Sequence, residues 1–437
     1  MSQRSVPSKL RVATSVLVFR HGDRSPAINF FAKEQSAAPT LAEKQRQEEE
    51  LQKSGGSKGP ETPESIEEIE AWSNRLPTLE ELDKYNEQFP VLHVDGMHDA
   101  HAVVQEAPTP SSIDNREDPF GKLTRRGMSQ LHANGVALRK RFDTPLKPEE
   151  VQLFSSDYTR THQSAQCLLR GLFDLDSADL GSRKDVRVPV LVPPRALNVA
   201  NSWEAKPRLR ELVASSVTTD SFFTEVEKEH EEAREKLIAN LPYYQENPEE
   251  FFWIYVCDYY VTREAHGLPI DPNVENVRDS TLSANLKRFL RWYMDEAISD
   301  LAAGDLLRAV HSHMERALTG DENTKRLLCF SGHDITLLPV LCALGFREGA
   351  ENDADFDKHW PPYASTLLFE LLVADEPTPT SSSGSSVEDS GEDDTAAAFV
   401  RVVYNDEVLA GPEPIDRFWA ERPIFGLKPN QAGGGHL

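Results

Sequence analysis

Val16–Pro26, with the sequence VLVFRHGDRSP, is the most informative stretch of the chain. It begins with a short apolar run that contains β-branched residues, which predicts a buried strand. Arg20, His21 and Arg24 follow at the carboxyl end of this strand, where open α/β sheets bind their ligands. Two guanidinium groups can bind the oxygens of one phosphoryl group, and a neutral imidazole is a good nucleophile near neutral pH. The stretch therefore predicts a phosphate site with His21 as its nucleophile.

Two other predicted strands end in residues of the same kind. Val151–Phe154 leads to Arg160, which lies in the first turn of the next predicted helix, where the backbone dipole also favours anions. Arg326–Phe330 leads to His333 and Asp334, before an apolar helix. Because neighbouring parallel strands end at the same edge of a sheet, we expect these side chains to join the first group in one site.

Each of these side chains has a chemical role in phosphoryl transfer. Arginines neutralise the charge on the non-bridging oxygens, and an imidazole attacks phosphorus in line. A carboxylic acid protonates the leaving alkoxide and then takes a proton from the water that cleaves the phosphohistidine. We expect no metal ion and no cofactor. The predicted catalytic residues are His21 and Asp334, and the predicted phosphate-binding residues are Arg20, Arg24, Arg160 and His333.

The order of these segments resembles that of the histidine acid phosphatases, which form branch 2 of the histidine phosphatase superfamily. Motifs typical of that family occur here in the expected order. They are Arg20–Pro26 (Arg-His-Gly-x-Arg-x-Pro), Leu123, Thr124 and Gly127 (Leu-Thr-x-x-Gly), Ser155–Thr161 with Ser164 and Ala165, the pair His333 and Asp334, and Pro361–Ser365 (Pro-Pro-Tyr-Ala-Ser).

The chain departs from the family pattern at two positions. Ser156 stands where the family usually has Thr, a change that keeps the hydroxyl group. Ile335 follows the His-Asp pair where Thr or Asn is more usual, which removes a polar side chain next to Asp334.

The resemblance implies an α/β fold, namely a three-layer sandwich with a mostly parallel central sheet and a mainly helical cap over its carboxyl edge. Residues 27–118 are predicted to form a polar insertion on the surface. A loop within the core is predicted to be disordered because of its polar composition. The expected core is 1–26, 119–199 and 321–437, the cap is 200–320, and the loop is 375–397.

Periodicity and end signals predict further elements. Thr124 is a candidate N-cap, and Ser156 or Asp157 is a candidate cap of the helix that ends near Phe173. The remaining predictions are helices at Leu41–Lys53, Leu79–Phe89, Phe222–Leu241, Phe251–Thr262, Leu286–Ala303 and Leu337–Leu344, a strand at Val188–Val192, and a hairpin of Thr366–Val373 with Ala398–Tyr404.

The resemblance implies a phosphomonoester hydrolase that works through a phosphohistidine without a metal. A phosphoglycerate-mutase-like phosphotransferase is an alternative, but that branch takes a Glu acid from another segment, and the His333–Asp334 pair argues against it. A non-catalytic scaffold that binds phosphorylated ligands is the other alternative. Loss of His21 or Asp334 would favour the scaffold, and both residues are present.

The expected partner is a small phosphorylated substrate, with lysophosphatidic acid as a candidate because the family includes a phosphatase for it. An aromatic-rich cap gives weak support, although the same rings equally fit ordinary packing. A short basic run, which equally fits a solvated turn, is a candidate anion patch. The aromatic residues are Phe222, Phe223, Tyr243, Tyr244, Phe251, Phe252 and Trp253, and the basic ones are Lys206, Arg208 and Arg210.

The 437 residues carry a formal net charge of −25. This acidic balance disfavours nucleic acid and anionic membranes as partners, so a phosphate site must be a local basic pocket. No run approaches the roughly 20 apolar residues that a membrane helix needs. The missing signal core predicts a cytoplasmic location, with the mitochondrion as an alternative because residues 1–12 are basic. Nothing in the sequence indicates an oligomeric state.

Several residues that suggest other chemistry have simpler interpretations. The four cysteines lack metal-ligand spacing, so we expect reduced core thiols. His93, His98 and His101 follow a His-x4-His-x2-His pattern, but no cysteine or helix frames them, and we expect solvated loop histidines. The tryptophans Trp253, Trp292 and Trp360 are expected to pack in the core or the cap.

Overall fold

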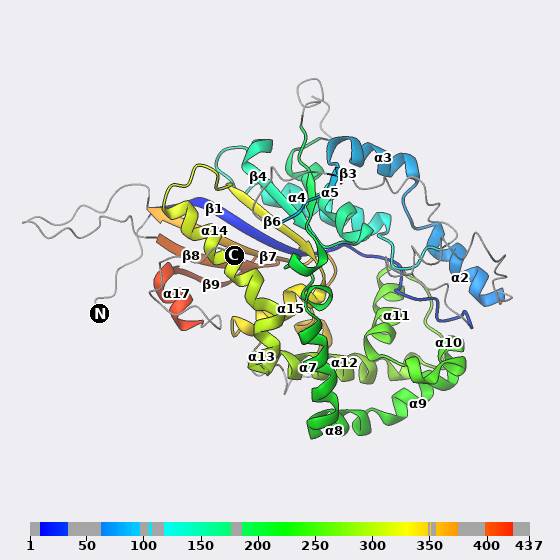
Figure 1. Cartoon of the computed structure of the whole chain (residues 1–437). Helices are drawn as coiled ribbons and strands as arrows, with labels where there is room; N and C mark the ends of the chain where they lie inside the picture. The colour runs from blue at the N-terminus through cyan, green and yellow to red at the C-terminus, as the bar shows by residue number, and fades with distance from the viewer. Residues whose placement is uncertain are drawn as a thin grey trace, which may run out of the picture.

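The computed structural model describes residues 9–33, 63–96, 105–106, 118–175, 186–347, 350, 355–374 and 398–422. A nine-stranded sheet in the order β3-β2-β5-β4-β6-β1-β7-β8-β9 runs through its core (Figure 1). The strands are β1 (Leu10–Arg20), β2 (Val91–His93), β3 (Gln105–Glu106), β4 (Val151–Ser155), β5 (Val190–Val192), β6 (Leu327–Gly332), β7 (Thr366–Ala374), β8 (Ala398–Tyr404) and β9 (Glu407–Pro414).

The sheet is parallel in its middle and antiparallel at both edges. Strands β2, β5, β4, β6 and β1 run parallel to one another. Strand β3 closes one edge, and the antiparallel strands β7, β8 and β9 close the other. Strand β6 lies between β4 and β1, with Ser331 opposite Ser155 and Gly332 opposite Arg20. The three strand ends that were predicted to carry the site are therefore neighbours.

Helices cover both faces of the sheet, which confirms the predicted three-layer sandwich. Side chains of β1 alternate between the layers: Val16 and Val18 join one apolar cluster, and Leu17 and Phe19 join another. A strand that is buried on both faces reads as a continuous apolar run, as β1 does. The first cluster includes helices α14 (Asp305–Leu318), α15 (Asp334–Ala343) and α17 (Ile415–Glu421), and the second includes α4 (Arg125–Arg139) and α5 (Thr159–Leu172).

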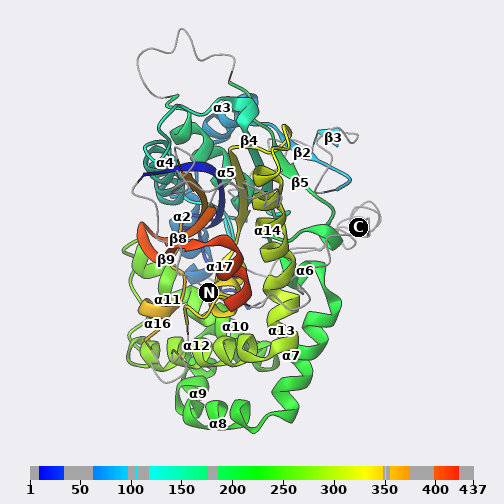
Figure 2. The same ribbon diagram turned by 90° about the vertical axis from the view of Figure 1, so that its left-hand side faces the viewer.

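A second, helical part of the chain lies beyond the carboxyl ends of the central strands (Figures 1 and 2). It has apolar clusters of its own, one around Trp292 and Phe289 and one around Tyr244 and Tyr259. Its helices are α6 (Ser202–Ala205), α7 (Pro207–Thr219), α8 (Ser221–Glu229), α9 (Glu231–Asn240), α10 (Pro242–Glu246), α11 (Trp253–Ala265), α12 (Arg278–Met294) and α13 (Glu296–Ser299).

Two helical predictions in the cap range need correction. The predicted helix Phe222–Leu241 is two helices, α8 and α9, because His230 leaves helical geometry between them. Helix α14 lies within residues 200–320 but packs on the sheet rather than in the cap. The reason is its apolar stripe: Leu306, Val310 and Met314 recur every fourth residue and are buried in the cluster that contains Val16.

Part of the range 27–118 also belongs to the core, contrary to the expected surface insertion. Helix α3 (Leu79–Gln88) agrees with its prediction, and α2 (Pro63–Ser73) carries the fully buried Trp72. Strand β2 pairs in parallel with β5 and extends the sheet. Its three residues are too few for a periodic signal, so only the pairing reveals it. The predicted helix Leu41–Lys53 and the loop 375–397 lie outside the described residues.

Other local predictions agree with the structure or differ by a few residues. Thr124 caps α4 by accepting a hydrogen bond from Gly127 N at 3.3 Å, and β7 pairs with β8 as predicted. Helix α5 begins after Tyr158 rather than after Ser156 or Asp157, because the Ser156 hydroxyl bonds to Thr161 and His333 instead. The predicted helix at Leu286–Ala303 ends at Met294, before α13 and a π-helical turn at Asp300–Gly304.

The four cysteines are free thiols; Cys167, Cys257 and Cys329 are buried, and Cys342 is partly buried. Among the described helices, none combines the length and the apolar character needed to cross a bilayer.

Candidate active site

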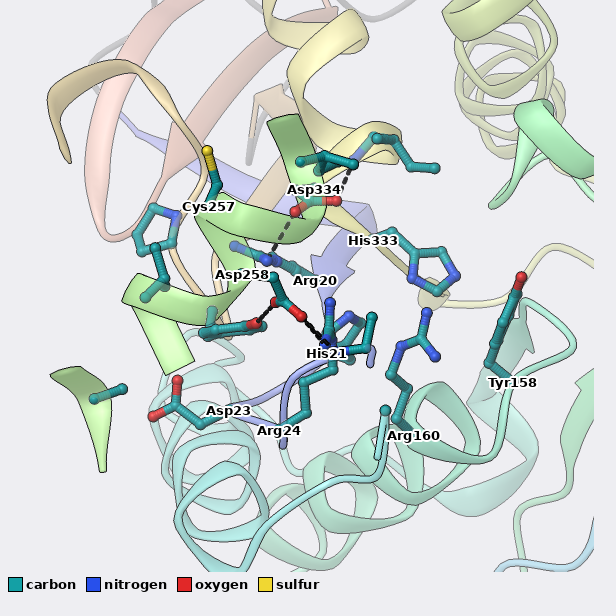
Figure 3. A pocket seen from close by; sticks show the side chains of 18 of the residues that line it. Arg20, His21, Asp23, Arg24, Tyr158, Arg160, Cys257, Asp258, His333 and Asp334 are labelled. Carbon is teal, nitrogen blue, oxygen red and sulfur yellow. Dashed lines mark hydrogen bonds and ion pairs between the residues drawn. The ribbon is translucent and has the colours of Figure 1, made fainter. Parts of the chain in front are cut away.

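All six predicted site residues line one cavity of about 800 Å³ at the carboxyl ends of β1, β4 and β6 (Figure 3). His21 follows β1 directly, Arg160 lies in the first turn of α5 after β4, and His333 and Asp334 follow β6. The sheet order explains the convergence, because β6 separates β1 from β4 by one strand. The cap helix α11 forms the opposite wall of this cavity.

The His21 imidazole is held as a neutral ring with one nitrogen free to react. Its Nδ1 lies 2.9 Å from the Gly22 carbonyl oxygen, which only accepts, so the proton is on Nδ1 and Nε2 keeps its lone pair. Burial holds the pKa of His21 well below its usual value, and the nearby charge of Arg160 lowers it further. A neutral imidazole with an exposed lone pair is the form that attacks phosphorus.

The loop after β1 is locked against the start of α4 by glycines. A Cβ atom on Gly22 would lie 2.4 Å from the Gly127 carbonyl oxygen, so neither of these two positions has room for a side chain. Thr124 donates from N and from Oγ1 to the Asp23 carbonyl oxygen, both at 3.0 Å. These contacts give a physical reason for the glycines in the Arg-His-Gly and Leu-Thr-x-x-Gly motifs.

Arg20 and Arg24 are both fixed by carboxylates and by an aromatic ring. Arg20 donates from Nη1 to the Pro361 carbonyl oxygen at 2.6 Å and forms an ion pair with Asp334 Oδ2 at 2.7 Å. Its guanidinium carbon lies 3.9 Å from the centre of the Tyr363 ring. Arg24 Nη1 donates to Asp258 Oδ2 at 2.7 Å. Tight ion pairs of this kind preorganise a guanidinium for an incoming oxyanion.

Arg160 is the cation of the site that has no anionic partner among the described residues. Its guanidinium carbon lies 4.2 Å from the centre of the Tyr158 ring, and its buried Nε finds no acceptor in the described chain. Burial lowers the pKa of Arg160 to about 10, and the charge of Arg24 contributes, so the group stays protonated near neutral pH. The buried Nε atoms of Arg20 and Arg24 lack acceptors in the same way. A buried donor without a partner is costly, and an oxyanion would satisfy it.

His333 and Asp334 are held by neighbours from several elements. His333 Nε2 lies 2.8 Å from Ser156 Oγ, and burial holds the pKa of His333 well below its usual value, with Arg160 contributing. Asp334 Oδ1 accepts from the Ile335 backbone N–H at 2.8 Å, and its Oδ2 accepts from Trp360 Nε1 at 3.2 Å. The serine keeps the hydroxyl function of the usual threonine, and the backbone at Ile335 supports the carboxylate without a polar side chain.

Four residues of this site had no assigned role in the sequence analysis. Tyr158 and Tyr363 stack on Arg160 and Arg20, and Trp360, which was expected only to pack, also donates to Asp334. Asp258 lies on α11, and its side chain is 7% exposed. A lone acid within the aromatic run of α11 was a signal for Asp258, because buried carboxylates need a partner.

The basic run that was a candidate anion patch lies away from the cavity. Lys206 forms an ion pair with Asp305 at 2.5 Å, Arg208 pairs with Glu211 at 3.0 Å, and Arg210 donates to the Trp203 carbonyl oxygen. These basic side chains are engaged by acidic residues or a backbone carbonyl nearby and do not form an anion site in the cavity.

The aromatic residues that were weak support for a lipid-like substrate also lie elsewhere. None of them lines the cavity, and six of the seven belong to the apolar clusters of the cap, while Phe252 is exposed on its surface. The expected packing roles of Trp253, Trp292 and Trp360 agree with their burial. The apolar part of the cavity wall comes instead from other side chains, among them Phe120, Ile254, Val261, Ala265, Ile335 and Phe356.

The candidate histidine motif gives no metal site in the part of the chain that the structure describes. His93 lies in β2, and His98 and His101 lie outside the described residues. Across the described ranges, no group of three His, Cys, Asp or Glu side chains is arranged to hold a metal ion.

Comparison with known proteins identifies the family. The model of the histidine phosphatase superfamily (branch 2) matches residues 11–405. The chain is 23% identical to the lysophosphatidic acid phosphatase type 6 of Mus musculus over 71% of its own length and 69% of that protein. It is 29% identical to the lysosomal acid phosphatase of Bos taurus, over 61% of the chain and 63% of the relative.

A solved phytase from D. castellii shares the fold, with a TM-score of 0.51 at 15% identity over 95% of this chain and 80% of the phytase. The chain spans between about half and two-thirds of the length of the lysophosphatidic acid phosphatases that it matches. Because the family model covers most of the sequence, from the first strand to β8, the chain belongs to branch 2 of the histidine phosphatase superfamily.

Proposed function

We propose that the protein is a metal-independent hydrolase of phosphomonoesters that works through a phosphohistidine on His21. One observation carries this proposal: Arg160, whose guanidinium has no anionic partner among the described residues, lies beside a neutral histidine whose Nε2 has a free lone pair. Arg20, Arg24 and His333 complete the ring of donors around the same point of the cavity. A phosphoryl group, with its negatively charged oxygens, matches the charge and the hydrogen-bonding needs of this arrangement.

The reaction consists of two transfers of the same phosphoryl group. In the first, His21 Nε2 forms a bond to phosphorus while the bond from phosphorus to the ester oxygen breaks, and the leaving oxygen takes a proton from Asp334. In the second, water attacks phosphorus, gives its proton to Asp334 and displaces His21. The net reaction converts a phosphomonoester and water into an alcohol and inorganic phosphate. Throughout both steps His21 keeps its proton on Nδ1 and donates it in a hydrogen bond to the Gly22 carbonyl oxygen, so the ring keeps its orientation.

Asp334 Oδ2 forms an ion pair with Arg20 Nη2 at 2.7 Å. Binding of the phosphoryl group draws Arg20 onto its oxygens and places a second negative charge near Asp334. A nearby like charge favours the protonated carboxylic acid, which is the form that donates to the leaving group. His333 donates from Nδ1 when the Ser156 hydroxyl donates to its Nε2. A mildly acidic optimum follows from the need for protonated Asp334.

The preferred substrate is a monophosphate with an apolar leaving group, and lysophosphatidic acid is our candidate. The wall beyond the phosphate site includes apolar side chains of α11 and its neighbours, among them Ile254, Val261 and Phe356, next to polar ones such as Glu264 and Asn285. Relatives named lysophosphatidic acid phosphatase type 6 support the same class. A cytoplasmic location stays a prediction.

The test uses His21→Ala and Asp334→Asn, with His311→Ala as the control because His311 lies on α14 outside the cavity. We expect His21→Ala to lose phosphate release by about 10⁴-fold or more while keeping its fold. Asp334→Asn should accumulate labelled phosphohistidine from p-nitrophenyl phosphate, whose leaving group needs little protonation, and should fail on alkyl phosphates. Near-normal turnover by His21→Ala would overturn the mechanism.

The same assay separates the alternatives. Phosphate release to water indicates a hydrolase, whereas transfer of label to an added phosphorylated acceptor would indicate a phosphotransferase. Tight binding of phosphate without labelled histidine on brief exposure to substrate would indicate a scaffold.

A further inference from the structure

Asp258 places a carboxylate from the cap directly against the phosphate site. The residue lies on α11, opposite the strand ends, and its side chain is 7% exposed. Oδ2 accepts hydrogen bonds from Arg24 Nη1 at 2.7 Å and from the Ala27 backbone N–H at 2.6 Å. Oδ1 accepts from the Tyr363 hydroxyl at 2.9 Å. Figure 3 shows Asp258 next to Arg24 and His21. A negative charge is unexpected in a site for anions, which makes Asp258 informative.

The charges around Asp258 show what this carboxylate does to an incoming phosphate. Arg24 and Tyr363 contact it, Arg160 faces it across the cavity, and Tyr255 and Cys257 flank it on α11. Asp258 and a phosphoryl oxygen bound to Arg24 share one guanidinium group, so they lie within a few ångströms of each other. Their repulsion grows with the charge on the phosphate.

We propose that Asp258 makes the site prefer the monoanionic form of the phosphoryl group over the dianion. The inference rests on the proposed function only in taking Arg24 as a ligand of the phosphoryl oxygens. At acidic pH the phosphate carries one negative charge, and Asp258 repels it weakly. Near and above neutral pH the phosphate carries two negative charges, and Asp258 opposes its binding more strongly. Asp258 also helps the release of phosphate, because its ion pair with Arg24 competes with the phosphate for that guanidinium group.

The isosteric variant Asp258→Asn separates charge from position. Asn keeps an oxygen for Arg24 and Ala27, and its amide N–H can donate to the Tyr363 oxygen, so both bonded sides of the carboxylate stay satisfied. Asp279→Asn is the matched control, because it removes the same charge from a cap residue that is 92% exposed and outside the cavity. Asp258→Glu keeps the charge and serves as a second variant.

The measurement is calorimetric binding of inorganic phosphate at about pH 5 and about pH 8. The wild-type chain and Asp279→Asn should bind phosphate more weakly at the higher pH. Asp258→Asn should bind about tenfold more tightly than the wild type at pH 8, with a smaller gain at pH 5. Asp258→Glu should bind phosphate more tightly at pH 5 than at pH 8, as the wild type does. This variant tests the inference even if Asp258→Asn does not fold.

The inference is overturned by an Asp258→Asn variant that is folded and has the same ratio of affinities at the two pH values as the wild type. It is also overturned by an Asp258→Glu variant that loses the preference, or by a wild-type chain that binds no phosphate at either pH. Failure of the proposed function is a different result, namely phosphate binding by the wild type without turnover of any phosphomonoester.

Discussion

Gly22 and Gly127 are in direct backbone contact, so that a Cβ atom on Gly127 would lie 2.2 Å from the Asp23 carbonyl oxygen. The contact presses the loop that carries His21 against the first turn of α4. Because both partners at this point are backbone, neither can move aside for a methyl group. The position of the nucleophile thus depends on the absence of two side chains.

We expect Gly127→Ala to lower the free energy of unfolding by about 1–3 kcal/mol, since overpacking of a rigid contact has that cost. Activity should fall as well, because the loop must shift. Gly96→Ala is the control, as its Cβ would meet nothing within 4 Å. Denaturant unfolding and phosphate-release kinetics measure both effects. Equal stability of the two variants would show that the loop relaxes freely.

Arg160→Met removes the guanidinium that has no anionic partner in the described part of the chain. We expect kcat/KM to fall by about 10²-fold or more, because a charge-assisted contact to the transition state is lost. Arg195→Met is the control, since Arg195 is already engaged by Asp157 at 3.4 Å. A loss of similar size in both variants would mean that general cavity charge, and not the Arg160 contact, drives the effect.

Tyr158 is expected to act as a positioning residue through its ring. The ring stacks on Arg160 and contacts the edge of His333, with 5.1 Å between the ring centres. Tyr158→Ala should raise KM and lower kcat by about tenfold, since a cation–π contact of roughly 1–2 kcal/mol is lost. Tyr158→Phe should restore most activity, because only the hydroxyl contact to Glu204 at 3.3 Å is missing. No rescue by Phe would assign the role to the hydroxyl instead.

The free energy of unfolding should fall as the pH drops from about 6.5 to about 4, because buried histidines resist protonation in the folded protein. Burial lowers the pKa of His313 to about 4 in the folded protein, whereas in the unfolded chain this histidine has its ordinary pKa of 6.5. The unfolded state therefore binds the extra proton first, so stability present above pH 6.5 is lost as the pH falls toward 4. This histidine alone contributes about 2–3 kcal/mol to that change. In His313→Gln, the difference in unfolding free energy between pH 7 and pH 4.5 should shrink by a similar amount. An unchanged difference would refute the assignment.

The catalytic side of the cavity was predictable from sequence because its signals are local. Apolar strands such as Val16–Phe19 end in charged residues, and a parallel sheet brings such ends together. The pairing of Asp258 with Arg24 was not predictable in this way. Its partner Arg24 lies 234 positions away, and only the packing of the cap brings the two together. The three residues of β2 and the apolar face of α14 likewise acquire their places from tertiary contacts rather than from local pattern.

The chain leaves the sheet after β5, builds the cap, and returns to the sheet at β6, which lies between β4 and β1. Every group proposed to react is carried by the sheet side of this excursion, whereas α11 faces the leaving group from the other side. Changes in this one continuous segment can therefore alter a wall that faces the substrate and leave the residues proposed to react untouched.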